Sequence, residues 1–200
     1  MIETDVLILG GGLVGAALAV ALDAHGLRSL VVDPADPAVT LAPGFDGRAS
    51  AVASASGRML AAIGVADRLA GQGCAIRAIR VSDGLAPGKL DFETAAGEAP
   101  LGTMYENRAL RRALHEAASA AARVDLRMKT RAADVRREAA AVCATLSTGE
   151  EVRAELLVAA EGRNSPTREA AGIALARWSY DHRAVIAAFH HERPHGQTAF

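Results

Sequence analysis

The spacing of apolar runs and glycines at the start of the chain predicts a strand, a helix and a second strand. Residues 5–9 form a short apolar run that ends in three glycines, which is typical of a buried parallel strand. Residues 13–25 are rich in Ala and Leu and stop before Gly26, as expected for a helix with a glycine C-cap. Residues 28–32 are a second strand. Together these segments predict a βαβ unit.

The pattern changes in the middle of the chain. Residues 34–49 have the prolines and glycines of a loop, and we expect residues 50–64 to form a helix. Residues 76–83 alternate apolar and polar side chains, so we expect a strand that pairs with residues 89–93 across a Gly/Pro turn. These two strands do not belong to a βαβ series, and they suggest a second sheet inserted into the first domain.

The second half of the chain returns to mixed helix and strand patterns. Residues 107–122 have an apolar face at helical spacing, and Asn107 can cap the start of this helix. Residues 156–160 are entirely apolar, so we expect them to enter a core. The other elements expected here are strands at 124–128, 142–146, 152–160 and 183–189, a hairpin turn at 148–150, and a turn at 161–166 into a short helix that reaches residue 171.

Composition narrows the class of protein. The 22 basic and 23 acidic residues give a net charge of -1, which argues against a nucleic-acid-binding surface. Cys74 and Cys143 are far apart and in no CxxC pair, which favours a reducing compartment over a disulfide framework. The N-terminus lacks a signal-peptide pattern, and the apolar stretches are shorter than the roughly 20 residues of a membrane span. We therefore expect a cytoplasmic protein.

The strongest motif is G-x-G-x-x-G, formed by Gly10, Gly12 and Gly15 between the first strand and the first helix. The first glycine permits a tight turn, the second lets the backbone approach a pyrophosphate, and the third lets helix and strand pack closely. The phosphate then binds at the helix N-terminus. Asp33 ends the second strand and is placed to accept hydrogen bonds from ribose hydroxyls. The alternative is a glycine-rich turn without a ligand, and the motif alone does not separate NAD from FAD.

Later segments resemble one family. The stretch AAEGRNSPTR at 159–168 resembles the Asp-Gly motif of flavin-dependent aromatic hydroxylases. The chain as a whole is similar to the ubiquinone-biosynthesis hydroxylases, FAD monooxygenases of the p-hydroxybenzoate hydroxylase class. The other stretches that carry this resemblance are DVLILGGGLVGAALA at 5–19, DGRASAVA at 46–53, VSDG at 81–84, NRALRRAL at 107–114 and HERPHGQTAF at 191–200.

The resemblance implies an α/β fold: a Rossmann-type FAD-binding domain with a parallel sheet and inserted substrate-domain strands. We expect the chain to be the N-terminal part of such a protein, because the family's later Gly-Asp motif is missing. The expected segments are a first FAD-domain part at 1–73, substrate-domain strands at 74–100, a second FAD-domain part at 101–175 and the start of the main substrate-domain sheet at 176–200.

The resemblance also assigns cofactor contacts beyond the first motif. Arg48 would lie near the flavin and Arg108 near the FAD phosphates, while the backbone of Val135 would contact adenine. Glu161 and Gly162 would serve the site shared by FAD and nicotinamide. Glu161 stands where the family usually has Asp, so its contacts are in doubt.

Two other features are interpreted as non-functional. Arg111 and Arg112 are expected to be solvated charges on a helix surface. The run from His191 to His195 matches the H-E-x-x-H zinc signature, but Pro194 would break the helix on which that signature depends. We therefore expect no metal site.

The activity implied by the resemblance is hydroxylation of a polyprenylated phenol in ubiquinone biosynthesis. NAD(P)H would reduce FAD, and molecular oxygen would add to give a flavin C4a-hydroperoxide. No catalytic side chain is identified, because the cofactor carries the chemistry. The alternatives are another FAD-dependent oxidoreductase of the same fold, or a truncated module without turnover. A peripheral contact with the inner membrane, a contact with a ubiquinone-biosynthesis complex, and a homo-oligomer all remain open.

Overall fold

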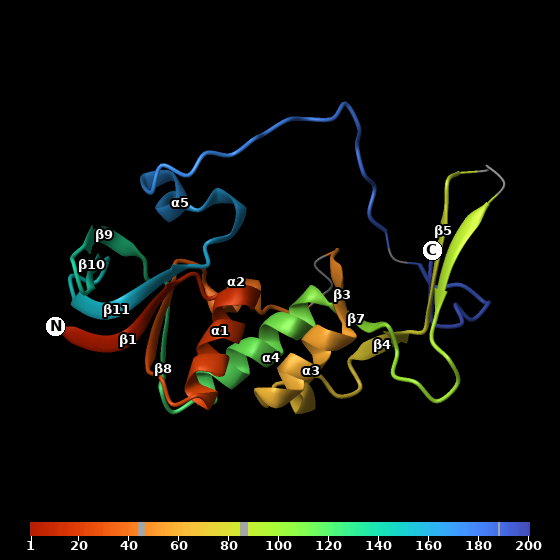
Figure 1. The fold of residues 1–200 in the computed structure, drawn as a ribbon, viewed down its shortest axis with the longest axis horizontal. Helices are drawn as coiled ribbons and strands as arrows, with labels where there is room; N and C mark the ends of the chain where they lie inside the picture. The colour runs from red at the N-terminus through yellow and green to blue at the C-terminus, as the bar shows by residue number, and fades with distance from the viewer. Residues whose placement is uncertain (44–46, 85–87, 188) are drawn as a thin grey trace. The chain divides into compact units, whose positions relative to one another are not determined.

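The computed structural model describes residues 1–43, 47–84, 88–187 and 189–200, which form two compact units (Figure 1). The first unit, called here the nucleotide unit, comprises Met1–Pro43 and Arg111–His182. The second comprises Gly44–Leu110 and Arg183–Phe200. The second unit begins with a segment whose strand β3 (Ala49–Ala53) pairs within that unit. The functional identity of the expected segments stays a prediction.

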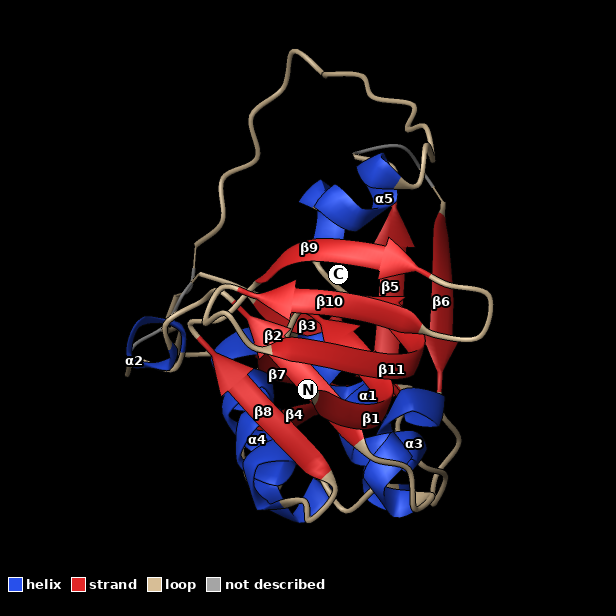
Figure 2. Cartoon of the chain, turned by 90° about the vertical axis from the view of Figure 1, so that its left-hand side faces the viewer, coloured by secondary structure: helices blue, strands red, loops and turns tan. Residues whose placement is uncertain are grey.

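The nucleotide unit is built on a six-stranded sheet in the order β8-β2-β1-β11-β10-β9 (Figure 2). The four strands from β8 to β11 are parallel, and β10 and β9 continue the sheet in antiparallel fashion. This arrangement confirms the predicted Rossmann-type fold. The strands are β1 (Ile2–Leu9), β2 (Ser29–Asp33), β8 (Val124–Met128), β9 (Ala132–Arg137), β10 (Val142–Leu146) and β11 (Glu151–Ala159).

The helices of this unit follow the local sequence signals. Helix α1 (Leu13–Ala24) connects β1 to β2, and Gly26 behind it has a positive φ of 81°, which suits glycine at a helix end. Of the two short helices, only α5 (Pro166–Ala170) was expected from the sequence. Helix α2 (Pro37–Thr40) lies in the segment expected to be a loop, and α5 follows the 3-10 turn at Gly162–Asn164.

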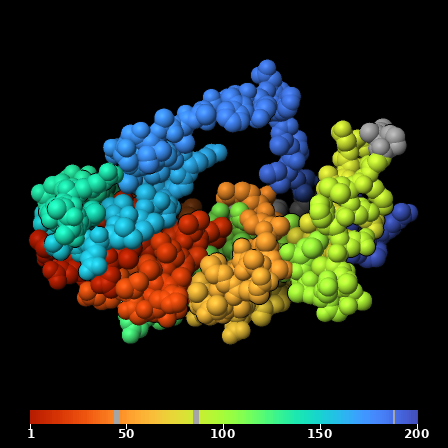
Figure 3. All heavy atoms as spheres, in the orientation of Figure 1, coloured from red at the N-terminus to blue at the C-terminus, as the bar shows by residue number. Residues whose placement is uncertain are grey.

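Both faces of the parallel sheet are buried at its centre, which explains the apolar runs Val6–Leu9 in β1 and Leu30–Val32 in β2. Alternation along each strand sends Val6 and Ile8 to one face, against Ala19 of α1, and Leu7 and Leu9 to the other. The second face is covered by the β9–β10 meander, whose atoms lie against those of β1 and β11 in the space-filling view (Figure 3). Each fully buried Leu, Ile or Val contributes about 1.5–3 kcal/mol to this core.

The second unit contains two small sheets. In one, β3 (Ala49–Ala53), β7 (Gly102–Glu106) and β4 (Gly73–Ile76) are antiparallel in the order β3-β7-β4. In the other, β5 (Ala78–Ser82) pairs with β6 (Lys89–Glu93) as predicted, and β12 (Thr198–Ala199) adds to β5. The turn between β5 and β6 includes residues 85–87, which lie outside the described residues. The helices are α3 (Ser54–Ala62), the 3-10 turn Ala66–Leu69, and the start of α4 (Asn107–Ala120).

Three expectations about secondary structure were wrong. Residues 50–53 form β3 rather than the start of a helix, because this backbone pairs with β7 and α3 begins only at Ser54. The strand expected at 76–83 is divided into β4 and β5, which belong to different sheets. Residues 183–187 and 189 form no strand, because within the described ranges no neighbouring strand pairs with them.

The core expected at residues 156–160 forms only in part. Val158 and Ala160 pack beside the helix-side core, and Leu157 packs beside the core under the meander. Leu156, however, is 56% exposed. It lies beyond Ala154, the last residue of β11 that pairs with β10.

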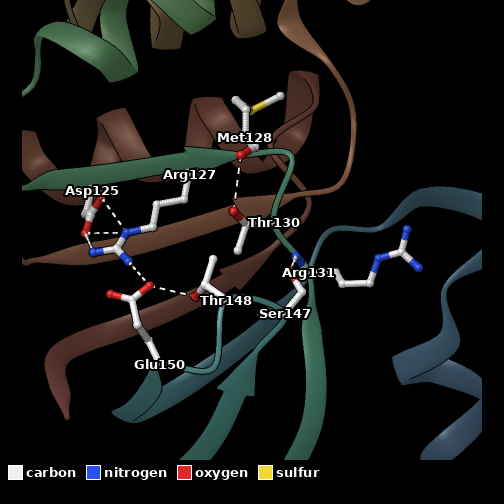
Figure 4. A network of polar contacts seen from close by, with 8 residues as sticks. All are labelled: Asp125, Arg127, Met128, Thr130, Arg131, Ser147, Thr148 and Glu150. Atoms are coloured by element: carbon white, nitrogen blue, oxygen red, sulfur yellow. Dashed lines mark hydrogen bonds and ion pairs between the residues drawn. The ribbon is translucent and has the colours of Figure 1, made fainter.

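A polar network ties the β10–β11 turn to β8 (Figure 4). Arg127 of β8 contacts Glu150 of the turn at 2.7 Å and Asp125 of its own strand at 2.8 Å. The hydroxyl of Thr148 also donates to Glu150, at 2.7 Å. The hydrogen bonds from Arg127 and then Thr148 lower the pKa of the Glu150 carboxyl from its ordinary value of 4.5. The ionised form of Glu150 is therefore favoured in the folded protein.

We expect Glu150→Gln to lower the urea midpoint of unfolding at pH 7. Because the folded-state pKa of Glu150 is depressed, its stabilising contribution is present above pH 4.5 and is lost as the pH falls through the lowered value. The difference from the parent should therefore shrink in acid. Glu151→Gln is the matched control, since Glu151 lies 4.0 Å from Arg136 and both side chains are at least half exposed. Equal midpoints for Glu150→Gln and the parent at pH 7 would show that the contacts of Glu150 with Arg127 and Thr148 do not stabilise the fold.

Candidate dinucleotide-binding site

The glycine motif lies at the carboxyl end of the parallel strands, where the order of the strands reverses. From β1 the chain passes to β2 and β8 on one side, while β11 pairs with β1 on the other. In open α/β sheets such a reversal leaves a crevice at the strand ends, which is where ligands bind. Residues Gly10 to Gly12 follow β1 at this point, and the turn at Glu161 follows β11.

Gly10 occupies a place that no other residue type fits. Its φ is 107°, and a Cβ atom there would lie 2.5 Å from the carbonyl oxygen of Ala160. Its amide donates to the carbonyl of Val32 at 2.8 Å, and the amide of Ala160 donates to Leu9 at 2.7 Å. The ends of β1, β2 and β11 are thereby joined through backbone alone.

Gly15 and Gly12 differ in what surrounds them. A Cβ at Gly15 would lie 1.8 Å from the carbonyl oxygen of Gly10, so the first turn of α1 rests directly on the preceding loop. A Cβ at Gly12 would meet no atom within 4 Å, so the fold leaves open space beside this residue. Gly12 caps α1, and its carbonyl accepts the first helical bond from Ala16 at 2.9 Å. This open backbone at a helix N-terminus fits a pyrophosphate.

Asp33 is held in place by two backbone amides. One carboxylate oxygen accepts from the amide of Gly11 at 2.7 Å, and the other from the amide of Ala35 at 2.7 Å. Each oxygen has a second acceptor position, so the carboxylate can still accept hydrogen bonds from ribose hydroxyls. The structure therefore brings Asp33 and the glycine loop together, as the sequence predicted.

A hollow connects these groups, and all of its lining residues belong to the nucleotide unit. We call it the Asp33 hollow. It is lined by Gly11, Gly12, Ala16, Asp33, Ala35, Thr40, Leu41, Arg111, Leu114, His115 and Met128.

Sequence reasoning missed the α4 side of the Asp33 hollow. Arg111, Leu114 and His115 come from α4, and Arg111 was interpreted as a solvated charge. The missed signal is the spacing i, i+3, i+4, which places these three side chains on one helical face. Leu114 is buried, so that face turns inward. Arg112 points elsewhere: its side chain is 53% exposed and lies 3.7 Å from Glu116.

Glu161 serves the turn that follows β11. One of its carboxylate oxygens accepts from the hydroxyl of Ser165 at 2.5 Å and from the amide of Thr167 at 3.2 Å. The longer side chain thus reaches the N-terminus of α5. Gly162 has a φ of 78°, which favours glycine, and Arg168 donates to the carbonyl of Gly162 at 3.5 Å. The contact of Gly10 with Ala160 places this turn beside the glycine loop.

Three further residues were predicted to contact the cofactor, and the structure shows the local surroundings of each. Val135 of β9 pairs with Ala144 of β10 and packs against the core beneath these two strands. It is not among the residues that line the Asp33 hollow. Arg48 and Arg108 belong to the second unit. There the carbonyl of Arg48 accepts from Asn107, and Arg108 lies 3.5 Å from Glu106. The roles of all three toward a flavin stay predictions.

We expect Gly15→Ala to destabilise the protein by about 3 kcal/mol, because the added methyl group overlaps the Gly10 carbonyl. Gly12→Ala should change the free energy of unfolding by less than about 1 kcal/mol, since only the helix cap is altered. Urea unfolding of the two variants measures the difference. Equal stability would show that the loop does not pack as described.

Glu161→Ala should speed hydrogen exchange of the Thr167 amide, because the capping carboxylate is removed. The expected loss at this turn is about 1 kcal/mol, which corresponds to roughly fivefold faster exchange. Glu169→Ala is the control on the same helix, since Glu169 is exposed and lies 3.9 Å from Arg177. Unchanged exchange at Thr167 in Glu161→Ala would rule out the capping role.

Comparison with known proteins identifies the family. Residues 3–192 match the FAD binding domain family. The chain is 44% identical to the ubiquinone hydroxylase UbiL of Rhodospirillum rubrum over 96% of its length, and 32% identical to the 3-demethoxyubiquinol 3-hydroxylase of Escherichia coli over 98%. It covers 44% and 51% of these relatives, so it spans about half of their length.

A solved structure of an FAD-dependent protein has a similar fold. PqsL of Pseudomonas aeruginosa, a probable FAD-dependent monooxygenase, superposes with a TM-score of 0.73 at 27% identity. The match covers 89% of this chain and 48% of PqsL. The family match and the PqsL structure name FAD, and the glycine loop has the geometry of a dinucleotide site. The chain belongs to the FAD binding domain family, and its relatives include proteins named as ubiquinone hydroxylases.

Proposed function

We propose that the protein is an FAD-dependent monooxygenase that hydroxylates a polyprenylated phenol in ubiquinone biosynthesis, with NAD(P)H and molecular oxygen as co-substrates. The observation that carries the proposal is the open backbone of Gly12 next to the fixed carboxylate of Asp33, in a chain whose relatives are named as ubiquinone hydroxylases. Open backbone for a pyrophosphate and a carboxylate for a ribose are the two groups that an adenine dinucleotide requires.

Within this proposal the residues of the chain bind and orient. The amide side of Gly12 would hold the pyrophosphate, and Asp33 would hold the adenosine ribose. The turn at Glu161 and Gly162, which the Glu161 carboxylate holds through Ser165 and Thr167, would border the site that FAD and nicotinamide share. When bound, the flavin supplies the chemistry of two-electron reduction and oxygen activation that ring hydroxylation requires.

The substrate class also suggests where the protein works. A polyprenylated phenol resides in a bilayer, and no helix in the described ranges is long and apolar enough to cross one. We propose a cytoplasmic protein that reaches its substrate at the surface of the inner membrane or through a biosynthetic complex. A related flavin oxygenase with another aromatic substrate is the second candidate, supported by the similarity to PqsL.

The proposal is tested on the full-length protein with FAD, NADH or NADPH, and a prenylated phenol under ¹⁸O₂. The expected product carries one ¹⁸O atom on the ring. The second candidate would be favoured if the enzyme released only hydrogen peroxide with every prenylated phenol but oxygenated another aromatic compound. A protein that purifies colourless and takes up no FAD would overturn both.

We expect Gly12→Val to abolish FAD retention while leaving the unfolding midpoint nearly unchanged. The isopropyl group would occupy the open space beside Gly12, where the pyrophosphate is proposed to bind. Gly57→Val is the matched control, because Gly57 lies in α3 of the second unit and a Cβ there also meets no atom within 4 Å. Flavin absorbance after gel filtration is the measurement. Equal flavin content in the two variants would show that the loop does not bind the cofactor.

A further inference from the structure

Cys74 and His195 form a side-chain pair in the second unit. The Sγ atom of Cys74 lies 3.8 Å from Nε2 of His195, within the range of a hydrogen bond to sulfur. The thiol also donates to the carbonyl of Ala75 at 3.7 Å. Cys74 is exposed and belongs to β4, an edge strand of its sheet. The pair therefore joins a nucleophilic atom to an imidazole at a place that solvent reaches.

Backbone pairing brings these two residues together across 121 positions of the sequence. The amide of Arg77, which directly follows β4, donates to the carbonyl of Gln197 at 2.9 Å. Immediately after these residues, β12 pairs with β5 in parallel register. The segment that carries His195 is thus fixed next to the strand that carries Cys74, so the pair does not depend on the two side chains alone.

The hydrogen bonds of the His195 ring decide which nitrogen carries the proton. The amide of Gln197 donates to Nδ1 at 3.0 Å, so Nδ1 must present its lone pair. A neutral imidazole then carries its proton on Nε2, the nitrogen that faces the sulfur of Cys74. His195 therefore donates to this sulfur and stabilises negative charge on it.

Cys143 has the opposite surroundings. Its Sγ donates to Oε1 of Glu138 at 3.3 Å. This hydrogen bond, with desolvation as the second cause, raises the pKa of the Cys143 thiol above its ordinary value of 9.0. A carboxylate thus keeps the proton on Cys143, whereas an N–H group faces the sulfur of Cys74. The two cysteines of the chain should therefore differ in reactivity.

We propose that Cys74 is an oxidation site that reacts with hydrogen peroxide to form a sulfenic acid, with His195 as the positioning residue that promotes the reaction. The thiol releases its proton to water, and the sulfur attacks one oxygen of the peroxide. An S–O bond forms and the O–O bond breaks. The sulfur loses two electrons to the peroxide, and the hydroxide that leaves takes up a proton to give water. Oxidation of this kind requires thiolate character and exposure, which the Nε2–H donor and the open position of Cys74 supply.

The experiment treats the full-length protein with hydrogen peroxide and traps the sulfenic acid with dimedone. Peptide mass spectrometry then reads the label at each cysteine. We expect Cys74 to be labelled ahead of Cys143. His195→Ala should slow the labelling of Cys74 roughly 3- to 10-fold, the factor for one lost hydrogen bond. His191→Ala is the matched control, because His191 is exposed in the same segment, and it should be labelled like the parent.

A purely structural role of His195 would change the reactivity of Cys74 in the other direction. If the ring only held its segment beside β4, its removal would expose Cys74 further and speed alkylation by iodoacetamide. We expect His195→Ala to slow this alkylation at Cys74 and to leave it unchanged at Cys143. An equal or faster reaction at Cys74 would overturn the role of His195. Dimedone labelling of Cys143 ahead of Cys74, or of neither cysteine, would overturn the oxidation site. Because the peroxide is added, none of these results depends on the proposed FAD chemistry.

Discussion

The close approach of three backbone segments at Gly10 is the contact on which the nucleotide unit depends. Gly10 passes beneath the Ala160 carbonyl at the end of β11, and α1 rests on Gly10 through Gly15. A side chain at either glycine would force these segments apart. The same contact ends β1, starts α1 and sets the Glu161 turn beside the loop. The candidate site is therefore a consequence of how the sheet and first helix pack.

The glycines of one motif have two separate physical tasks. Gly10 and Gly15 are required by the fold, because the space for a Cβ atom is already filled by backbone. Gly12 is not required by the fold, since the space beside it is open. Open space beside the backbone at the N-terminus of α1 leaves room for an anionic ligand. Together with the fixed Asp33 carboxylate, this makes the dinucleotide the simplest account of the loop.

Carboxylates also hold both ends of β11, the strand that pairs with β1 at the site. Glu150, just before the strand, is bound by Arg127 of β8. Glu161, after it, caps α5 through Ser165 and Thr167. These contacts give Glu161 a local structural role that the motif alone did not reveal.

The sequence by itself determined the β1–α1–β2 unit, the β10–β11 hairpin and the close packing at Gly10 and Gly15. These depend on residues within about thirty positions, where periodicity and missing side chains are informative. Tertiary structure decided the rest. Residues 50–53 became a strand because β7 pairs with them, and residues 183–187 formed none because no described strand does. Arg111 entered the hollow, and Val135 lay outside it, because packing between distant segments decides which side of an element faces the site.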